Sequence, residues 1–161
     1  MRPIKTILVP TDFSAASKRA LSYACNIADG FGATLHVLHV LQDPFTADGY
    51  MGLYLPNPEV YTAKAEQQAR AELESLLTDA QKEAYSAVFV LQWGTPVHEI
   101  LDYIRSHGGI DLVVLATSGH GAVARMMLGS VADKLVRQAP CPVLTVHEHD
   151  RSDSAGEDRA A

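Results

Sequence analysis

Two glycines and a serine near the end of the chain have types and spacing that suit anion binding. Gly119 follows an apolar run that ends at Leu115, and after a spacer of nine residues come Gly129 and Ser130, directly before a stretch with helical spacing. Backbone N–H groups that glycines leave uncovered bind anions, and so does the positive end of a helix dipole. Ser130 with Asp133 three residues on is a capping-box pattern, which predicts that a helix begins there. Together these features predict a phosphate site.

A second polar turn contains a carboxylate. Thr11, Asp12, Phe13 and Ser14 follow an apolar run that Pro10 ends. Asp12 suits a contact with a ribose hydroxyl or with Mg²⁺, which normally arrives with a triphosphate and keeps several of its waters. The same side chain suits a purely local role as a turn-forming or capping aspartate. The residues alone leave both interpretations open.

Two histidines and an arginine are further candidates for the site. Arg125 lies in the spacer between Gly119 and Gly129 and suits either a contact with a terminal phosphate or an exposed position on a loop. We interpret His120 as a solvated loop residue rather than a catalytic base. His39 alternates with apolar neighbours, which predicts a hydrogen-bonded histidine in the core or at the edge of a cleft.

The chain that must position these residues alternates between short apolar runs and stretches with helical spacing. Runs rich in aliphatic residues predict five strands, at residues 4–10, 34–41, 87–92, 112–115 and 142–146. Periodic apolar residues predict four helices, at residues 14–31, 59–84, 95–107 and 130–139. Residues 42–58 contain three prolines and two glycines without a sustained period, which predicts a long connecting loop of a kind that is usually functional or mobile.

This alternation predicts a doubly wound, five-stranded parallel sheet with helices on both faces. Ligands of such sheets bind beyond the carboxyl ends of the strands, at the point where the strand order reverses. A strand order of 3-2-1-4-5 would bring the turn after the first strand, with Asp12, beside the turn after the fourth strand, which begins at Thr117. The predicted site is therefore one crevice with a carboxylate on one wall and an anion site on the other.

Bulk composition narrows the classes of protein that the chain can belong to. With 161 residues, 47% of them hydrophobic and 20% charged, the chain suits one globular domain. A net charge of −6 without a basic block argues against nucleic acid or an anionic membrane as partner.

No apolar run approaches the roughly 20 residues that span a bilayer, and the first residues lack a signal-peptide pattern. Two isolated cysteines, Cys25 and Cys141, suit a reducing cytoplasm. We expect a cytoplasmic domain at residues 1–148 and a disordered acidic tail at residues 149–161.

Several of these segments together resemble the universal stress protein family. They are ILVPTDFS at residues 7–14, ATSG at residues 116–119, the nine-residue spacer, and GSVADKLVRQAPCPVLTV at residues 129–146. The resemblance covers about residues 4–147. It implies the adenine-nucleotide α-hydrolase-like fold. In this family the last strands of two subunits pair, which implies a homodimer through residues 142–146, from Pro142 to Val146.

ATP-binding members of the family share a motif of glycine, two residues, glycine, nine residues, glycine, and serine or threonine. The resemblance assigns its second glycine to Gly119, its third to Gly129 and its hydroxyl to Ser130, whose N–H would meet phosphate oxygens together with that of Val131. The first glycine position is occupied by Ala116, which departs from the motif.

The resemblance also implies which residues contact the ribose, the metal ion and the adenine. Asp12 matches the family's carboxylate near ribose and metal, with Pro10 and Thr11 beside it. Val40 matches the position whose backbone contacts adenine. Thr117 lies in the phosphate turn.

The function that we predict is a cytoplasmic stress-response regulator. It would act as a homodimer that binds ATP, or ADP or AMP, with Mg²⁺, and whose interactions with unidentified protein partners depend on occupancy. One alternative is a nucleotide-free interaction module, which the departure at Ala116 favours. Another is a slow ATP hydrolase, for which only Asp12, His120 and Arg125 are available near the site and no GxxxxGK[ST] loop exists. We assign no catalytic residue and expect no nucleic acid or membrane partner.

Overall fold

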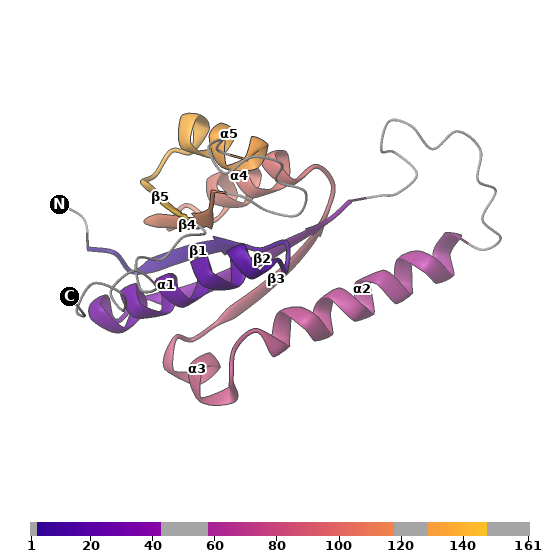
Figure 1. The fold of residues 1–161 in the computed structure, drawn as a ribbon, viewed down its shortest axis with the longest axis horizontal. Helices are drawn as coiled ribbons and strands as arrows, with labels where there is room; N and C mark the ends of the chain where they lie inside the picture. Colours follow the sequence, from indigo (N-terminus) through magenta and orange to yellow (C-terminus); the bar gives the residue numbers. More distant parts are fainter. Residues whose placement is uncertain (1–2, 43–57, 118–128, 148–161) are drawn as a thin grey trace, which may run out of the picture.

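The computed structural model describes residues 3–42, 58–117 and 129–147. Within them five strands alternate with helices (Figure 1). The elements are β1 (Thr6–Pro10), α1 (Ala15–Phe31), β2 (Thr34–Leu41), α2 (Pro58–Ser75), α3 (Asp79–Ala84), β3 (Val88–Trp93), α4 (Pro96–Ser106), β4 (Leu112–Ala116), α5 (Ser130–Gln138) and β5 (Val143–Val146).

The strands form one sheet in the order β3-β2-β1-β4-β5, and all four neighbouring pairs are parallel. This order confirms the predicted 3-2-1-4-5 topology. The chain runs outward from β1 to β3 on one side, then crosses over to β4 and β5 on the other. The order therefore reverses between β1 and β4, which makes the carboxyl ends of these two strands the expected ligand position.

Helices cover both faces of the sheet. Alternate residues of β1 belong to two separate cores: Ile7 and Val9 pack with α1 and with Leu73 of α2, whereas Leu8 packs with α4 and α5. Figure 1 shows α1 and α2 on one side of the strands and α4 and α5 on the other. Because both faces are covered, the central strands β1 and β4 are apolar apart from Thr6, as expected for a buried parallel sheet.

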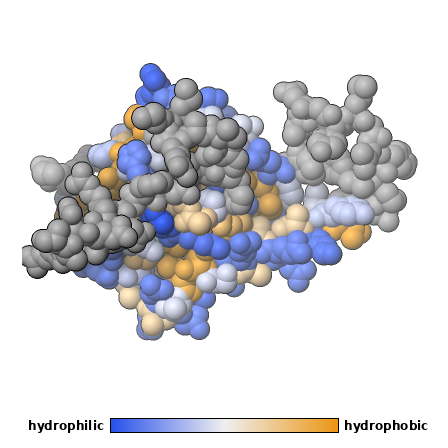
Figure 2. Space-filling view, viewed as in Figure 1, coloured by the Kyte–Doolittle hydropathy of each residue, from blue (hydrophilic) through white to orange (hydrophobic). Residues whose placement is uncertain are grey.

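The helix predicted at residues 59–84 is two helices, and this prediction was wrong. The apolar stripe that suggested one helix reaches Leu77, but Ala80 and Ala84 are exposed. Thr78 begins α3 with a capping box: its hydroxyl accepts from the Gln81 backbone and the Gln81 side chain accepts from the Thr78 backbone. These reciprocal bonds satisfy the donors of a new helix start, so the chain changes direction there. The exposed residues of α2 are mostly hydrophilic (Figure 2), although Val60 and Tyr61 near its start are exposed as well.

Some predicted features lie outside the described residues. They are residues 43–57 of the predicted loop, Gly119, His120 and Arg125 of the phosphate turn and spacer, and the tail at residues 149–161. No helix in the described ranges is both long enough and apolar enough to cross a membrane.

Candidate functional site

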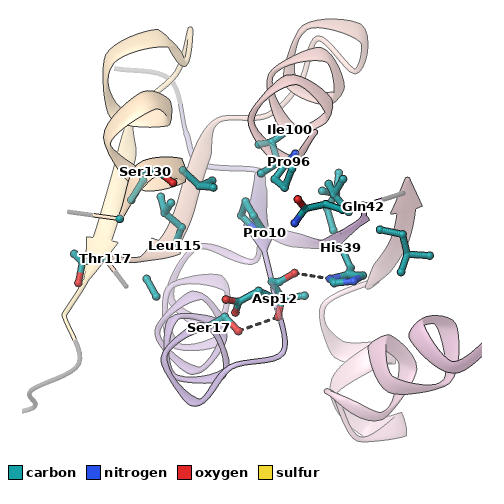
Figure 3. A pocket seen from close by; sticks show the side chains of 18 residues that line it. Pro10, Asp12, Ser17, His39, Gln42, Pro96, Ile100, Leu115, Thr117 and Ser130 are labelled. Carbon is teal, nitrogen blue, oxygen red and sulfur yellow. Dashed lines mark hydrogen bonds between the residues drawn. The ribbon is translucent and has the colours of Figure 1, made fainter. Parts of the chain in front are cut away.

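A cavity of about 620 Å³ opens at the carboxyl ends of β1, β2 and β4, where the strand order reverses (Figure 3). Nine of the eleven residues predicted for the site line it: Pro10, Thr11, Asp12, Val40, Ala116, Thr117, Gly129, Ser130 and Val131. The remaining two, Gly119 and Arg125, lie outside the described residues. The cavity is within the size range of pockets that hold small ligands. The sequence analysis thus named nine of the eighteen described residues that line this cavity.

One wall of the cavity is the turn that contains Asp12. Hydrogen bonds within this turn, and others to α1 and β2, hold it in place. The buried Thr11 donates its N–H to the Leu38 carbonyl at 2.8 Å, and its Oγ1 lies 3.0 Å from Ser17 Oγ. The Asp12 carboxylate accepts at Oδ1 from the Ser14 N–H at 3.1 Å and from its hydroxyl at 2.6 Å. Asp12 therefore has the turn-forming role that the sequence left open, and it lines the cavity as well.

Ser14 begins α1 as its N-cap. Its hydroxyl accepts from the Ser17 N–H at 3.1 Å, which satisfies one of the free donors of the first helical turn. Ser17 is the site residue that the sequence analysis missed: it is buried, lines the cavity and bonds to Thr11. A serine among the alanines of the buried stripe of α1 was the available signal, because a buried hydroxyl needs a partner.

The opposite wall is the start of α5. Gly129 donates its N–H to the Thr117 carbonyl at 2.6 Å, and Thr117 in turn donates to the Val146 carbonyl at 2.9 Å. These bonds join the end of β4 and the start of α5 to the end of β5. They place Gly129, Ser130 and Val131 on the cavity wall.

The capping box predicted at Ser130 is wrong. Gly129 is the N-cap of α5, Ser130 is the first helical residue, and no side chain of the described residues caps this helix. The Asp133 carboxylate instead pairs with Arg137 on the next turn, with 3.0 Å between Oδ1 and Nε. The first N–H groups of α5 are thus left to other acceptors, which strengthens the case for an anion site.

The conformation of Gly129 does not itself require glycine. Its φ of −57° and ψ of 151° are open to other residues. Glycine therefore contributes here through its missing side chain, which leaves the backbone itself on the wall of the cavity.

The electrostatics of the cavity favour an anion through local donors. The helices α1, α4 and α5 all begin at this edge of the sheet, and Pro96 at the first turn of α4 also lines the cavity. Helix N-termini carry a partial positive charge that acts over about one turn. Asp12 is the one carboxylate among the described lining residues, and no group of three or more metal-ligating side chains exists in the described ranges. A Mg²⁺ ion here would depend on Asp12, water and ligand oxygens.

The remaining wall is largely apolar. It includes Leu38, Val40, Ile100 and Leu115, while His39 lies at its edge with its ring beside Asp12 (Figure 3). His39 Nδ1 lies 2.8 Å from the Thr11 carbonyl oxygen, so the expected hydrogen-bonded histidine at a cleft edge is confirmed. An apolar wall opposite a polar one suits a ligand with a flat apolar part and an anionic part.

The fold and the site define a doubly wound α/β protein with a ligand cavity at the switch point of its sheet. Residues 3–147 match the sequence model of the universal stress protein family, and the chain belongs to that family.

Individual relatives agree with this assignment. A putative universal stress protein of Staphylococcus haemolyticus is 33% identical over 151 residues, which cover 91% of this chain and 86% of the relative. The solved structure of the universal stress protein UspA from Lactobacillus plantarum is 30% identical, with a TM-score of 0.71, and the match covers 91% of this chain and 99% of UspA.

Two more distant structures have the same fold and contain a nucleotide. One is a universal stress protein in complex with cAMP, with 24% identity, a TM-score of 0.64, and coverage of 91% of this chain and 98% of that protein. The other is a universal stress protein family protein from Arabidopsis thaliana with AMP bound, with 18% identity, a TM-score of 0.56, and coverage of 96% and 97%.

Proposed function

We propose that this protein binds an adenine nucleotide, ATP with Mg²⁺ in the first place, and acts as a stress-response regulator. The observation that carries the proposal is the N-terminus of α5, which no side chain of the described residues caps, on one wall of a cavity whose other wall holds the Asp12 carboxylate. Backbone donors at a helix start suit phosphates, and a carboxylate suits ribose hydroxyls and a phosphate-bound metal ion.

In this proposal the phosphates lie against Thr117, Gly129, Ser130 and Val131, with Gly119 and Arg125 completing their binding. The ribose and Mg²⁺ lie at Asp12, beside Pro10 and Thr11. Adenine lies against the backbone of Val40, next to the apolar wall. Supporting evidence comes from the cavity volume of about 620 Å³ and from the family members that contain AMP and cAMP.

Binding rather than turnover is the proposed activity. Hydrolysis needs a positioned base and several charge-stabilising groups around the phosphoryl group. The described lining offers one carboxylate, Asp12, and one imidazole, His39, but no lysine or arginine. Regulation then follows if occupancy favours one set of protein contacts over another. The regulator is proposed to be cytoplasmic, with its domain at residues 1–148, a tail beyond it, and a homodimer contact along β5.

A second candidate function is a nucleotide-free interaction module. Ala116 lines the cavity at the position of the motif's first glycine, so its methyl group occupies space that ATP-binding relatives leave open. Replacement with glycine tests this directly. Tight ATP binding by Ala116→Gly, together with none by the wild type, would favour the second candidate.

Two measurements test the nucleotide proposal. Native mass spectrometry of gently purified protein is expected to show a bound adenine nucleotide. Calorimetry with ATP and Mg²⁺ is expected to show weaker binding by Gly129→Val, whose side chain enters the phosphate end. Gly30→Val is the control, because a Cβ at Gly30 meets nothing within 4 Å and α1 ends far from the cavity wall there. Equal affinities of wild type and Gly129→Val would contradict the phosphate assignment.

A further inference from the structure

Strand β2 binds both backbone polar groups of Thr11, the residue before Asp12. Leu38 accepts from the Thr11 N–H at 2.8 Å through its carbonyl oxygen, and His39, the next residue, places Nδ1 at 2.8 Å from the Thr11 carbonyl oxygen. The Thr11 hydroxyl is also engaged, by Ser17 Oγ at 3.0 Å and by the Phe13 N–H at 3.1 Å. Among these contacts, only the one from His39 joins Thr11 to a side chain of β2.

The chemistry of this contact assigns the proton on the imidazole ring. A carbonyl oxygen only accepts hydrogen bonds, so Nδ1 must be the donor. In the neutral ring the proton therefore lies on Nδ1, and Nε2 carries a lone pair. The tautomer of His39 is thus set by the backbone of the turn that bears Asp12.

Phe13 completes this arrangement with an unusual backbone conformation. Its φ is +65°, a left-handed value that is uncommon for a residue with a large side chain. The Phe13 ring lies on the His39 ring, with 4.2 Å between their centroids and 33° between their planes. Such strain persists where the surroundings hold it, and it is common at binding sites. Here the packed Phe13 ring restricts the orientation of the His39 ring, which contacts the Thr11 carbonyl.

We infer that His39 is a positioning residue of the cavity: its Nδ1–H holds the Thr11 carbonyl, and through it sets where the Asp12 carboxylate stands on the cavity wall. Asp12 follows Thr11 directly, so a shift of the Thr11 peptide moves its side chain. The inference rests on the proposed function for its consequence in nucleotide binding, but the position of the turn can be measured without a nucleotide. The role needs one N–H donor at the place of Nδ1 and no proton transfer.

A matched pair of variants isolates that donor. His39→Asn keeps an amide N–H near the position of Nδ1, whereas His39→Leu has a similar size and no donor. Both lose the aromatic contact with Phe13, so the difference between them reports the hydrogen bond. His36→Leu is the control, because His36 lies on the same strand but bonds to Tyr103 and does not line the cavity.

Three measurements follow. In nucleotide-free protein, the amide resonances of Asp12 and Phe13 are expected to shift in His39→Leu and to stay near wild type in His39→Asn. The ring ¹⁵N resonances of wild-type His39 at about pH 8, where histidine is ordinarily neutral, are expected to show the Nδ1–H tautomer. ATP with Mg²⁺ is expected to bind His39→Leu roughly fivefold to tenfold more weakly than wild type, with His39→Asn within about twofold.

The outcomes separate this inference from the proposed function. An Nε2–H tautomer in the wild type would overturn the inference, and this measurement does not depend on whether any variant folds. Equal effects of His39→Asn and His39→Leu on the turn would overturn it as well. If wild type binds no nucleotide while the tautomer and the turn behave as expected, the proposed function fails and the positioning role of His39 stands.

Discussion

The hydroxyl of Ser14 donates to the carboxylate of Asp12, with 2.6 Å between Oγ and Oδ1, and accepts from the Ser17 N–H at 3.1 Å. One side chain thus caps α1 and holds the only carboxylate of the described cavity lining. The stability of the helix start and the position of the proposed ribose and Mg²⁺ contact therefore depend on the same residue.

Ser14→Ala is expected to lower the free energy of unfolding by about 1 kcal/mol, the usual cost of losing an N-cap, and to weaken binding of ATP with Mg²⁺. Urea denaturation and calorimetry measure the two effects. Ser22→Ala is the matched control, because the Ser22 hydroxyl is exposed within α1 and reaches only the Lys18 carbonyl, at 3.4 Å. Its stability should stay within about 0.5 kcal/mol of wild type. Equal losses in both variants would count against the capping role.

The topology was predictable because each of its signals is local. Aliphatic runs, the glycine at the end of α1 and the proline at the start of α4 each mark an element boundary in the sequence, and alternation then gives a parallel sheet. The break after α2 was also marked, by Thr78 and Gln81 in capping-box spacing. It was missed because the apolar stripe continued past it, and periodicity does not reveal a change of direction.

The site was predictable at its turns and not at its long-range contacts. Asp12 and Gly129 follow elements that end at the switch point, so topology alone brings them to one cavity. The contact of His39 with Thr11 depends on the register in which β2 pairs with β1, and a sequence pattern leaves that register open. The helix start at Ser130 was predicted correctly, but its N-cap was misplaced by one residue, since Gly129 and Ser130 are both acceptable N-caps.

Gln92 in β3 has a buried oxygen, Oε1, that finds no hydrogen-bond partner among the described residues. A buried acceptor without a donor destabilises the native state, and a methionine fills a similar volume without that cost. Gln92→Met is therefore expected to raise the free energy of unfolding by about 1 kcal/mol in urea denaturation.

Gln81→Met provides the comparison for Gln92→Met. The same substitution there removes the side chain that accepts from the Thr78 N–H at 3.0 Å in the capping box of α3. It should lower the free energy of unfolding by about 0.5–1 kcal/mol. A loss of stability in both variants would show that Gln92 Oε1 is satisfied in solution.

His36 is expected to make stability depend on pH. Burial lowers the pKa of His36 below its ordinary value of 6.5, and the neighbouring His107 lowers the pKa further. The unfolded chain therefore binds a proton at His36 more readily than the native protein does. The contribution of the neutral ring is present above pH 6.5 and is lost as the pH falls below that value.

Replacing His36 with glutamine removes this titration. Between about pH 7.5 and pH 5, wild type should lose more free energy of unfolding than His36→Gln does, because other groups titrate equally in both. Ser22→Ala, which removes no titratable group, is the control and should lose as much as wild type over the same range. A wild-type slope retained in His36→Gln would refute the assignment.

The dimer proposal can be tested at the two edges of the sheet. Strand order makes β5 one edge and β3 the other, and each presents an exposed apolar residue of similar exposure: Leu144 at 38% and Val88 at 40%. On the β5 side α5 adds Val136, which is 49% exposed. An exposed apolar edge strand is a template for pairing with another chain, so β5 with its apolar flank suits a second copy.

In a twofold-symmetric contact both copies carry any substitution, so Leu144→Lys brings two ammonium groups to one interface. Juxtaposed like charges cost several kcal/mol, which should raise the dimer dissociation constant by more than about a hundredfold. Light scattering after size exclusion should therefore report a monomer for Leu144→Lys and a dimer for wild type and Val88→Lys. If Val88→Lys dissociates and Leu144→Lys does not, the subunits pair through β3. Since Leu144 is already partly exposed, the monomer should keep its fold, and its ATP affinity then shows whether one subunit suffices for the cavity.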